Sequence, residues 1–148
     1  MDASLIGYVF AIHLLSTGFM CGLIWFVQIV HYPLFKRVPE SGFVAYEQAH
    51  TRLTGWVVLP VMLAELGTAV LLSFTPVEIL PAGPARLNLA GLVLIWLSTF
   101  FLQVPLHQRL SKRFDARDHR HLVMTNWIRT VLWTLRFGAL AGIQANCF

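Results

Sequence analysis

The segment TNWIRTVLWTLR, Thr125–Arg136, opens an apolar stretch that continues to Ile143 and carries two arginines. Arg129 and Arg136 are seven residues apart, so in an α-helix of about 3.6 residues per turn they lie on one face. An otherwise apolar helix that carries two permanent charges needs partners for them. The segment therefore predicts a helix that packs against other helices with polar side chains.

The composition favours a membrane protein. Of the 148 residues, 57% are hydrophobic and 12% are charged, whereas soluble domains average about 25% charged residues. Four stretches are long enough to cross about 30 Å of hydrocarbon, namely residues 5–30, 53–74, 86–106 and 122–142. We expect an all-α fold, in which residues 1–148 form a single domain that is a polytopic membrane four-helix bundle. The first stretch is not expected to be a cleaved signal peptide, because no basic residue precedes it and its apolar run is too long.

The basic residues predict the orientation. Eight of them flank two of the connecting segments: Lys36, Arg37, Arg52, Arg109, Lys112, Arg113, Arg117 and Arg120. Only Arg86 flanks the opposite face. Since cytoplasmic loops carry the excess of basic residues, we expect a multi-pass protein of the plasma (inner) membrane with both termini outside, in the periplasm. The net charge of +4 then reflects topology and anionic lipids, and no nucleic-acid partner is expected.

Two segments share a short pattern. EQAHTRLTGW, residues 47–56, and DHRHLVMTNW, residues 118–127, both read acid-x-x-His-x-x-x-Thr-x-Trp. Each stands where a helix is expected to enter the membrane from the cytoplasm. A duplication would give two helical hairpins related by a pseudo-two-fold axis along the membrane normal. A match this short is equally compatible with coincidence.

The offset of 71 residues between these segments also relates Glu65 to Arg136. Both residues are expected about 20 Å from the start of their helix, at about 1.5 Å per residue. An isolated charge near the centre of a membrane costs about 2.5–3.5 kcal/mol, so we expect the two to form a buried ion pair. The pair either stabilises helix packing or forms a polar centre for a substrate or a proton path.

Arg129 lies nearer the cytoplasmic end and shares a helix face with Asn126. Its guanidinium could extend to the lipid headgroups. Gln28 and Gln103 are expected at a similar depth, and this clustering favours a polar pocket that faces inward, near the cytoplasmic side.

One histidine is expected at the cytoplasmic end of each helix: His31, His50, His107 and His121. Glu47 and Asp118 each precede one of them by a helical turn, so that both side chains can reach one ion. Di-metal bundles use a related Glu-x-x-His pattern. These six residues predict a site for iron, copper or zinc, or a haem between two of the histidines. Histidines at a wet interface, and acid–base catalysis without a metal, remain as alternatives.

Three stretches carry a family resemblance: HYPLFKRVP (residues 31–39), QVPLHQRL (103–110) and TNWIRT (125–130). Together they resemble the landmarks of the anthrone-oxygenase-like family of small four-helix membrane proteins. The resemblance implies oxidation of a polycyclic anthrone to a quinone by dioxygen, without a metal. Asn126 and Arg129 match the Asn and Arg of that family. His107 stands where the family has Asn, and the other histidines depart from its pattern.

Two classes of function follow. In the first, the protein is a membrane oxidoreductase, oxygenase-like, that acts on a lipid-soluble aromatic or quinone-type molecule. Arg129 and Asn126 would stabilise a developing oxyanion, while His107 or His31 would accept the proton. In the second, the protein is a non-catalytic carrier, a metal- or haem-handling protein, or an accessory subunit. The expected partners are membrane lipids and a small hydrophobic molecule, and either class is compatible with a homo-oligomer or a larger membrane complex.

Overall fold

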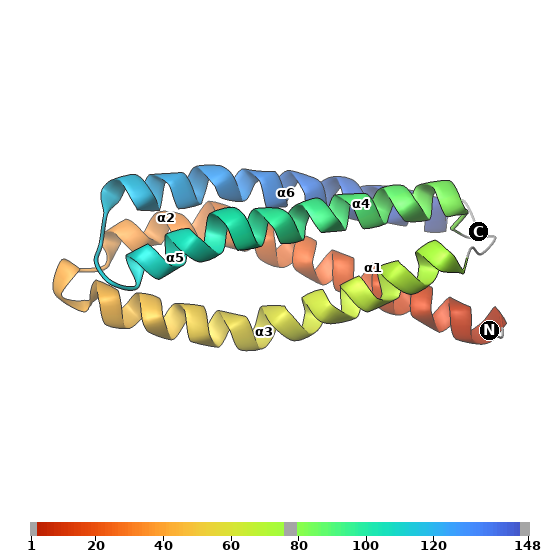
Figure 1. Cartoon of the computed structure of the whole chain (residues 1–148), viewed down its shortest axis with the longest axis horizontal. Coiled ribbons are helices and arrows are strands. Elements are labelled where there is room, and N and C mark those ends of the chain that lie inside the picture. Colours follow the sequence, from red (N-terminus) through yellow and green to blue (C-terminus); the bar gives the residue numbers. More distant parts are fainter. Residues whose placement is uncertain (1–2, 76–79, 146–148) are drawn as a thin grey trace.

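A computed structural model describes residues 3–75 and 80–145. The elements in these ranges are α1 (Ala3–Phe26), the π turn η1 (Val27–His31), α2 (Tyr32–Leu34), the 3₁₀ turn η2 (Phe35–Arg37), α3 (Glu40–Phe74), α4 (Ala82–Ser98), the π turn η3 (Thr99–Gln103), α5 (Val104–Leu110) and α6 (Ala116–Ala145). No strand occurs among the described residues, so the prediction of an all-α fold is confirmed. The segments from α1 to η2 and from α4 to α5 are each continuous, so the chain forms four helical rods (Figure 1).

The four rods run side by side along one axis (Figure 1). α1 packs against α3 and α6, and α4 packs against the same two helices. The first turn of α1 and the last turn of α6 lie at one end of the molecule. The short helices α2 and α5 and the first turns of α3 and α6 lie at the opposite end, which we call the site end.

The helices extend beyond the apolar spans expected from the sequence. α3 begins at Glu40 rather than near residue 53, and α6 begins at Ala116 rather than near residue 122. The added turns are held by their own buried residues, since Phe43 of α3 is fully buried against the aromatic side chains of η2 and of the α5–α6 connection. An apolar span therefore marks only the middle of each helix.

Each π turn comes just before a proline. Pro33 follows η1, and Pro105 follows η3. A proline has no N–H to donate to the carbonyl four residues earlier, and its ring clashes with that carbonyl. A π turn places one more residue in the helical turn, which accommodates the proline without ending the helix. Both rods consequently continue past a residue that normally terminates a helix.

The distribution of polar and apolar side chains is the reverse of that in a soluble protein. Large apolar side chains such as Leu15, Trp56 and Phe74 are 72%, 76% and 81% exposed, whereas His13 and Glu65 are 1% and 0% exposed. Extensive apolar surface is typical of contact with another protein or with lipid.

Three helices within the described ranges are long and apolar enough to cross a membrane: Ser4–Arg37, Glu40–Phe74 and Ala82–Leu110. α6 was expected to be a fourth, but it does not belong to this group. Its buried Asn126, Arg129 and Arg136 lower its apolar content.

The apolar core is densest toward the site end, where the side chains of all four rods meet. Its fully buried members include Phe35, Phe43, Leu110, Leu122 and Trp133. A smaller core at the other end contains Phe10, Leu72, Leu80, Ala85 and Leu140. The polar residues described below lie between these two cores and at the site end.

Asp115 caps the first turn of α6. Its Oδ1 accepts the backbone N–H of Asp118 at 3.0 Å and that of Arg117 at 2.8 Å. The backbone N–H of Asp118, and to a smaller extent that of Arg117, holds the pKa of the Asp115 carboxyl below the usual range of an aspartate. An N-cap side chain of this kind pairs backbone groups that the helix itself leaves without partners.

We expect Asp115→Ala to lower the thermal unfolding midpoint at neutral pH. Because the pKa of Asp115 is depressed in the folded state, its stabilising contribution is present above the unfolded pKa and is lost as the pH falls through the folded pKa. The difference between wild type and variant should therefore shrink in acid. Circular dichroism melts in detergent at several pH values measure it. Asp115→Asn, which retains an acceptor, is the control, and a deficit of Asp115→Ala that does not change with pH would contradict this role.

Candidate functional site

His107 joins two buried residues at the site end. Its Nδ1 lies 2.5 Å from Oε1 of Glu47, and its Nε2 lies 2.9 Å from the hydroxyl of Tyr32. Glu47 is fully buried and Tyr32 is 3% exposed. The ionised carboxylate can only accept, so Nδ1 carries the hydrogen of the first contact. Nε2 of a neutral His107 then accepts from Tyr32.

His50 lies beside this chain of contacts. Its Nδ1 is 2.9 Å from Nε2 of His31 and 3.0 Å from the hydroxyl of Thr54. The rings of His50 and His107 have centroids 5.5 Å apart. His31, His50 and His107, three of the four histidines expected at one site, therefore come together from three of the four rods.

Two of the predicted ligands do not join the cluster. Asp118 forms an ion pair with Arg109, with 3.1 Å between Oδ2 and Nε. His121 is exposed, and among the described residues the possible metal ligands that converge are Glu47, His50 and His107. The structure thus does not bring Asp118 and His121 to the other predicted ligands. The second acid-x-x-His segment forms the first turns of α6, and its His121 faces outward. The two segments share a pattern, but their histidines have different surroundings.

Tyr32 is the residue that the sequence analysis missed. It sits in the quoted stretch HYPLFKRVP, where helical spacing from Gln28 allows either His31 or Tyr32 to face inward, and His31 was the residue expected there. The π turn η1 places an additional residue in that turn, so Tyr32 is buried whereas His31 is only half-buried. Nε2 of His119 lies 2.8 Å from the carbonyl oxygen of Tyr32 and holds its backbone in place.

Arg129 closes the site from α6. Its Nε donates to Oδ1 of Asn126 at 3.0 Å, and Nη2 donates to the same oxygen and, at 3.4 Å, to the hydroxyl of Tyr32. Asn126 in turn donates to Oε1 of Gln28 at 2.8 Å. Arg129 is only 8% exposed, and no carboxylate in the described part of the chain forms an ion pair with it. Its positive charge is therefore held by neutral partners.

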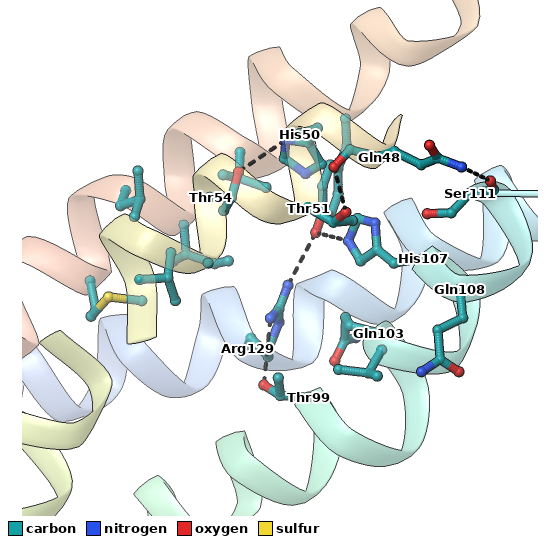
Figure 2. Close-up of a pocket in the computed structure, with 18 of the residues that line it drawn as sticks. Gln48, His50, Thr51, Thr54, Thr99, Gln103, His107, Gln108, Ser111 and Arg129 are labelled. Carbon is teal, nitrogen blue, oxygen red and sulfur yellow. Dashed lines mark hydrogen bonds between the residues drawn. The ribbon is translucent and has the colours of Figure 1, made fainter. Parts of the chain in front are cut away.

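A cavity of about 590 Å³ lies against these groups. Its polar wall includes Tyr32, His50, His107 and Arg129, and the close-up shows His107 and Arg129 reaching toward each other from α5 and α6 (Figure 2). The other walls are mainly apolar: Met20, Leu23, Ile24, Val27, Val58, Val104 and Trp133. A mostly apolar cavity with a few converging polar groups is typical of a small-molecule site.

The second buried arginine has a carboxylate partner. Nη1 of Arg136 lies 2.6 Å from Oε1 of Glu65, so the structure brings together the two residues that were expected to pair. Thr17 and Trp133 also donate to the Glu65 carboxylate, at 2.9 Å and at 3.2–3.3 Å. Asn88 accepts from Arg136 through its side chain, at 2.8 Å from Nη2. These contacts connect all four rods.

Two further residues complete this central network. His13 contacts Thr68 through Nδ1 at 3.0 Å and Asn88 through Nε2 at 3.1 Å. Gly91 of α4 leaves room for the stem of Arg136, since a Cβ at this glycine would lie 3.0 Å from Cδ of the arginine. His13 is thus a hydrogen-bonded packing residue.

A haem between His31 and His50 does not fit the geometry. Two histidines that bind one iron from opposite faces would need nitrogens about 4 Å apart, twice a metal–nitrogen bond of about 2.0 Å. The two nearest nitrogens lie 2.9 Å apart and share a hydrogen bond. No porphyrin can lie between this pair.

The chain matches no known protein family, no characterised protein and no solved structure.

The Glu65–Arg136 pair should couple in a double-mutant cycle. Glu65→Leu or Arg136→Leu alone strands a buried charge, so each should lower the free energy of unfolding by about 3–5 kcal/mol. The double variant should lose less than either single variant, because removing both partners leaves an apolar core and no stranded charge. Unfolding in detergent, followed by circular dichroism, measures all four proteins. Additive losses would show that the two charges do not interact.

Proposed function

We propose that this chain is an integral membrane oxidoreductase, oxygenase-like, that acts on a lipid-soluble aromatic molecule of the phenol, anthrone or quinol class. The observation that carries the proposal is Arg129, a buried guanidinium without a carboxylate partner in the described ranges that lines a mainly apolar cavity. A buried positive charge held only by neutral groups is suited to a substrate oxygen that becomes negative during reaction.

The proposal includes the membrane arrangement. Four helices form a bundle in the membrane, with α6 as the fourth span because its charged groups face the other helices. The packing of α1 and α4 each against both α3 and α6 supports a bundle of two hairpins related by a pseudo-two-fold axis along the membrane normal. A π turn before a proline in both α1–α2 and α4–α5 supports the same relation.

The cavity favours a flat apolar molecule that enters from the side. It is bordered by Gln48, Thr51 and Gly55 of α3 on one side and by Gln108 of α5 and the adjoining Ser111 on the other. Its volume of about 590 Å³ lies within the range of about 300–1,000 Å³ that is usual for small-molecule sites. A ring system would lie among the apolar walls with one oxygen directed to Arg129 and Tyr32.

The chemistry begins with proton removal. The O–H of the substrate (for an anthrone, that of its enol tautomer) gives its proton through the hydroxyl of Tyr32 to Nε2 of His107, while Glu47 holds the imidazole by its Nδ1–H. The substrate oxygen becomes an enolate or phenolate, which Arg129 stabilises. Dioxygen is the oxidant: one of its atoms becomes the new carbonyl oxygen of the quinone, and the other leaves as water with the two hydrogens of the oxidised carbon.

The resemblance to the anthrone-oxygenase-like family is part of this proposal. Asn126 and Arg129, the two residues that match that family, are hydrogen-bonded to each other at the site. His107, which replaces the family's Asn, supplies the proton acceptor in this chain. Anthrone is therefore the first substrate to test.

Arg129→Met should lower the rate of anthrone oxidation by about 10²–10³-fold, the usual cost of removing one oxyanion-stabilising donor. Oxygen uptake by the purified protein in detergent micelles, above the rate in micelles alone, measures the effect. Arg120→Met is the matched control, since it removes an exposed arginine of the same helix. If the two variants oxidise and bind anthrone equally well, the role of Arg129 is refuted. Binding of anthrone without oxygen uptake by the wild type would favour a carrier.

The proposed orientation places both termini outside and the site end in the cytoplasm, because the eight basic residues named above lie at the site end. A phosphatase reporter that is active only outside the cytoplasm should be active when fused to the C-terminus. The same reporter inserted after Lys112, between α5 and α6, should be inactive. The opposite pair of results would reverse the topology.

A further inference from the structure

Three potential ligands converge at the polar wall of the cavity. Glu47 and His50 stand one turn apart on α3, and His107 stands on α5. One donor atom from each side chain lies within 4.8 Å of the donors of the other two. Ligands bound to one ion at about 2.0–2.2 Å come to lie at most about 4.4 Å apart, so only a small adjustment of the side chains separates this arrangement from a bound ion.

Glu47 has one oxygen that the structure leaves without a partner. Its Oε1 contacts His107, whereas Oε2 is buried and has no hydrogen-bond partner in the described part of the chain. The residue is 0% exposed, so water cannot pair with this oxygen from outside. Buried carboxylate oxygens normally have hydrogen bonds or bind metals. Oε2 therefore indicates a ligand at this point.

We propose that Glu47, His50 and His107 bind one divalent first-row transition-metal ion. Two imidazoles and one carboxylate form the donor set of non-haem iron(II) oxygenases and of several catalytic zinc sites. In both kinds of site the protein supplies three ligands and leaves further positions open. His50 and His107 line the cavity, and Glu47 lies behind them, so the open positions of the ion face the space where a small molecule binds.

The neighbours of the ligands have the arrangement of outer-shell partners. Thr54 and His31 contact Nδ1 of His50 and orient its ring, and Tyr32 contacts Nε2 of His107. Metal-bound histidines usually hydrogen-bond in this way through the nitrogen that does not bind the metal. The sequence predicted six ligands. The structure supports three, with His31 as a neighbour and with Asp118 and His121 excluded.

This inference does not rest on the proposed function. An ion between Glu47 and His107 replaces the proton that these two residues otherwise share. His107 then donates through Nε2 to Tyr32 and no longer accepts from it, so the proton removal proposed above belongs to the metal-free protein. Tyr32 and Arg129 remain as the polar groups that face a substrate.

Cobalt(II) is the probe that tests the site. The protein is purified in detergent with an affinity tag that contains no histidine, stripped with a chelator and titrated with cobalt(II). We expect visible absorption bands of protein-bound cobalt that saturate at about one ion per chain. Glu47→Gln, His50→Ala and His107→Ala should each abolish these bands. His121→Ala is the matched control, since it removes an exposed histidine that lies outside the cluster, and it should bind cobalt as the wild type does.

A milder variant distinguishes loss of the metal site from misfolding of the protein. Thr54→Val removes only the hydroxyl that contacts His50 and should weaken cobalt binding by about 10–100-fold, the usual effect of losing an outer-shell partner. Far-ultraviolet circular dichroism checks that each variant remains helical. Absence of cobalt bands in the wild type, or unchanged bands in His50→Ala, overturns the proposal.

The metal site and the proposed function can be refuted independently of each other. Cobalt binding in a protein that neither binds nor oxidises anthrone supports the metal site and refutes the proposed function. Oxidation of anthrone that depends on Arg129, in a wild type that binds no cobalt, refutes the metal site alone. Metal analysis of protein purified without chelator then identifies the natural ion, and iron or zinc at the stoichiometry of the cobalt titration supports the site.

Discussion

Polar side chains inside this molecule have to find their partners within the bundle, because the outer surface of the rods is made of large apolar side chains. The central network meets this constraint most completely. Glu65 of α3 and Arg136 of α6 neutralise each other, while Thr17, Trp133 and Asn88 complete their hydrogen bonds. Each helix thereby supplies a group that another helix needs, and the relative positions of the four rods follow from these pairings.

The two buried arginines have different partners, which suits one to packing and the other to the proposed stabilisation of a substrate oxygen. Arg136 has the carboxylate of Glu65 at 2.6 Å, which neutralises its charge inside the packed helices. Arg129 is held by Asn126, Thr99 and Tyr32, which are neutral, and it lines the cavity. A buried guanidinium with neutral partners keeps most of its attraction for an anion. The site end is therefore the part of the molecule in which a substrate oxygen would be stabilised most strongly.

The prolines matter because they change the register of the helices that reach the site. An ordinary α-helix repeats about every 3.6 residues, so spacing from Gln28 places His31 and Tyr32 about equally well on the inner face. The π turn before Pro33 decides in favour of Tyr32, which becomes buried beside His107. π turns are frequent at functional sites in general, and in this chain one of them places a hydroxyl between an imidazole and a guanidinium.

The sequence by itself determined the all-α fold and the four rods, since these depend on composition and on helical periodicity. It also determined the partnership of Glu65 and Arg136, because opposite charges at equal depth in an apolar environment have few other partners. Only the tertiary structure decided which histidines meet. Glu47 and His50 turn inward whereas Asp118 and His121 do not, although the two segments share one pattern. The reason is physical: a pattern sets which residues share a helix face, but the rotation of each helix about its axis depends on how its neighbours pack.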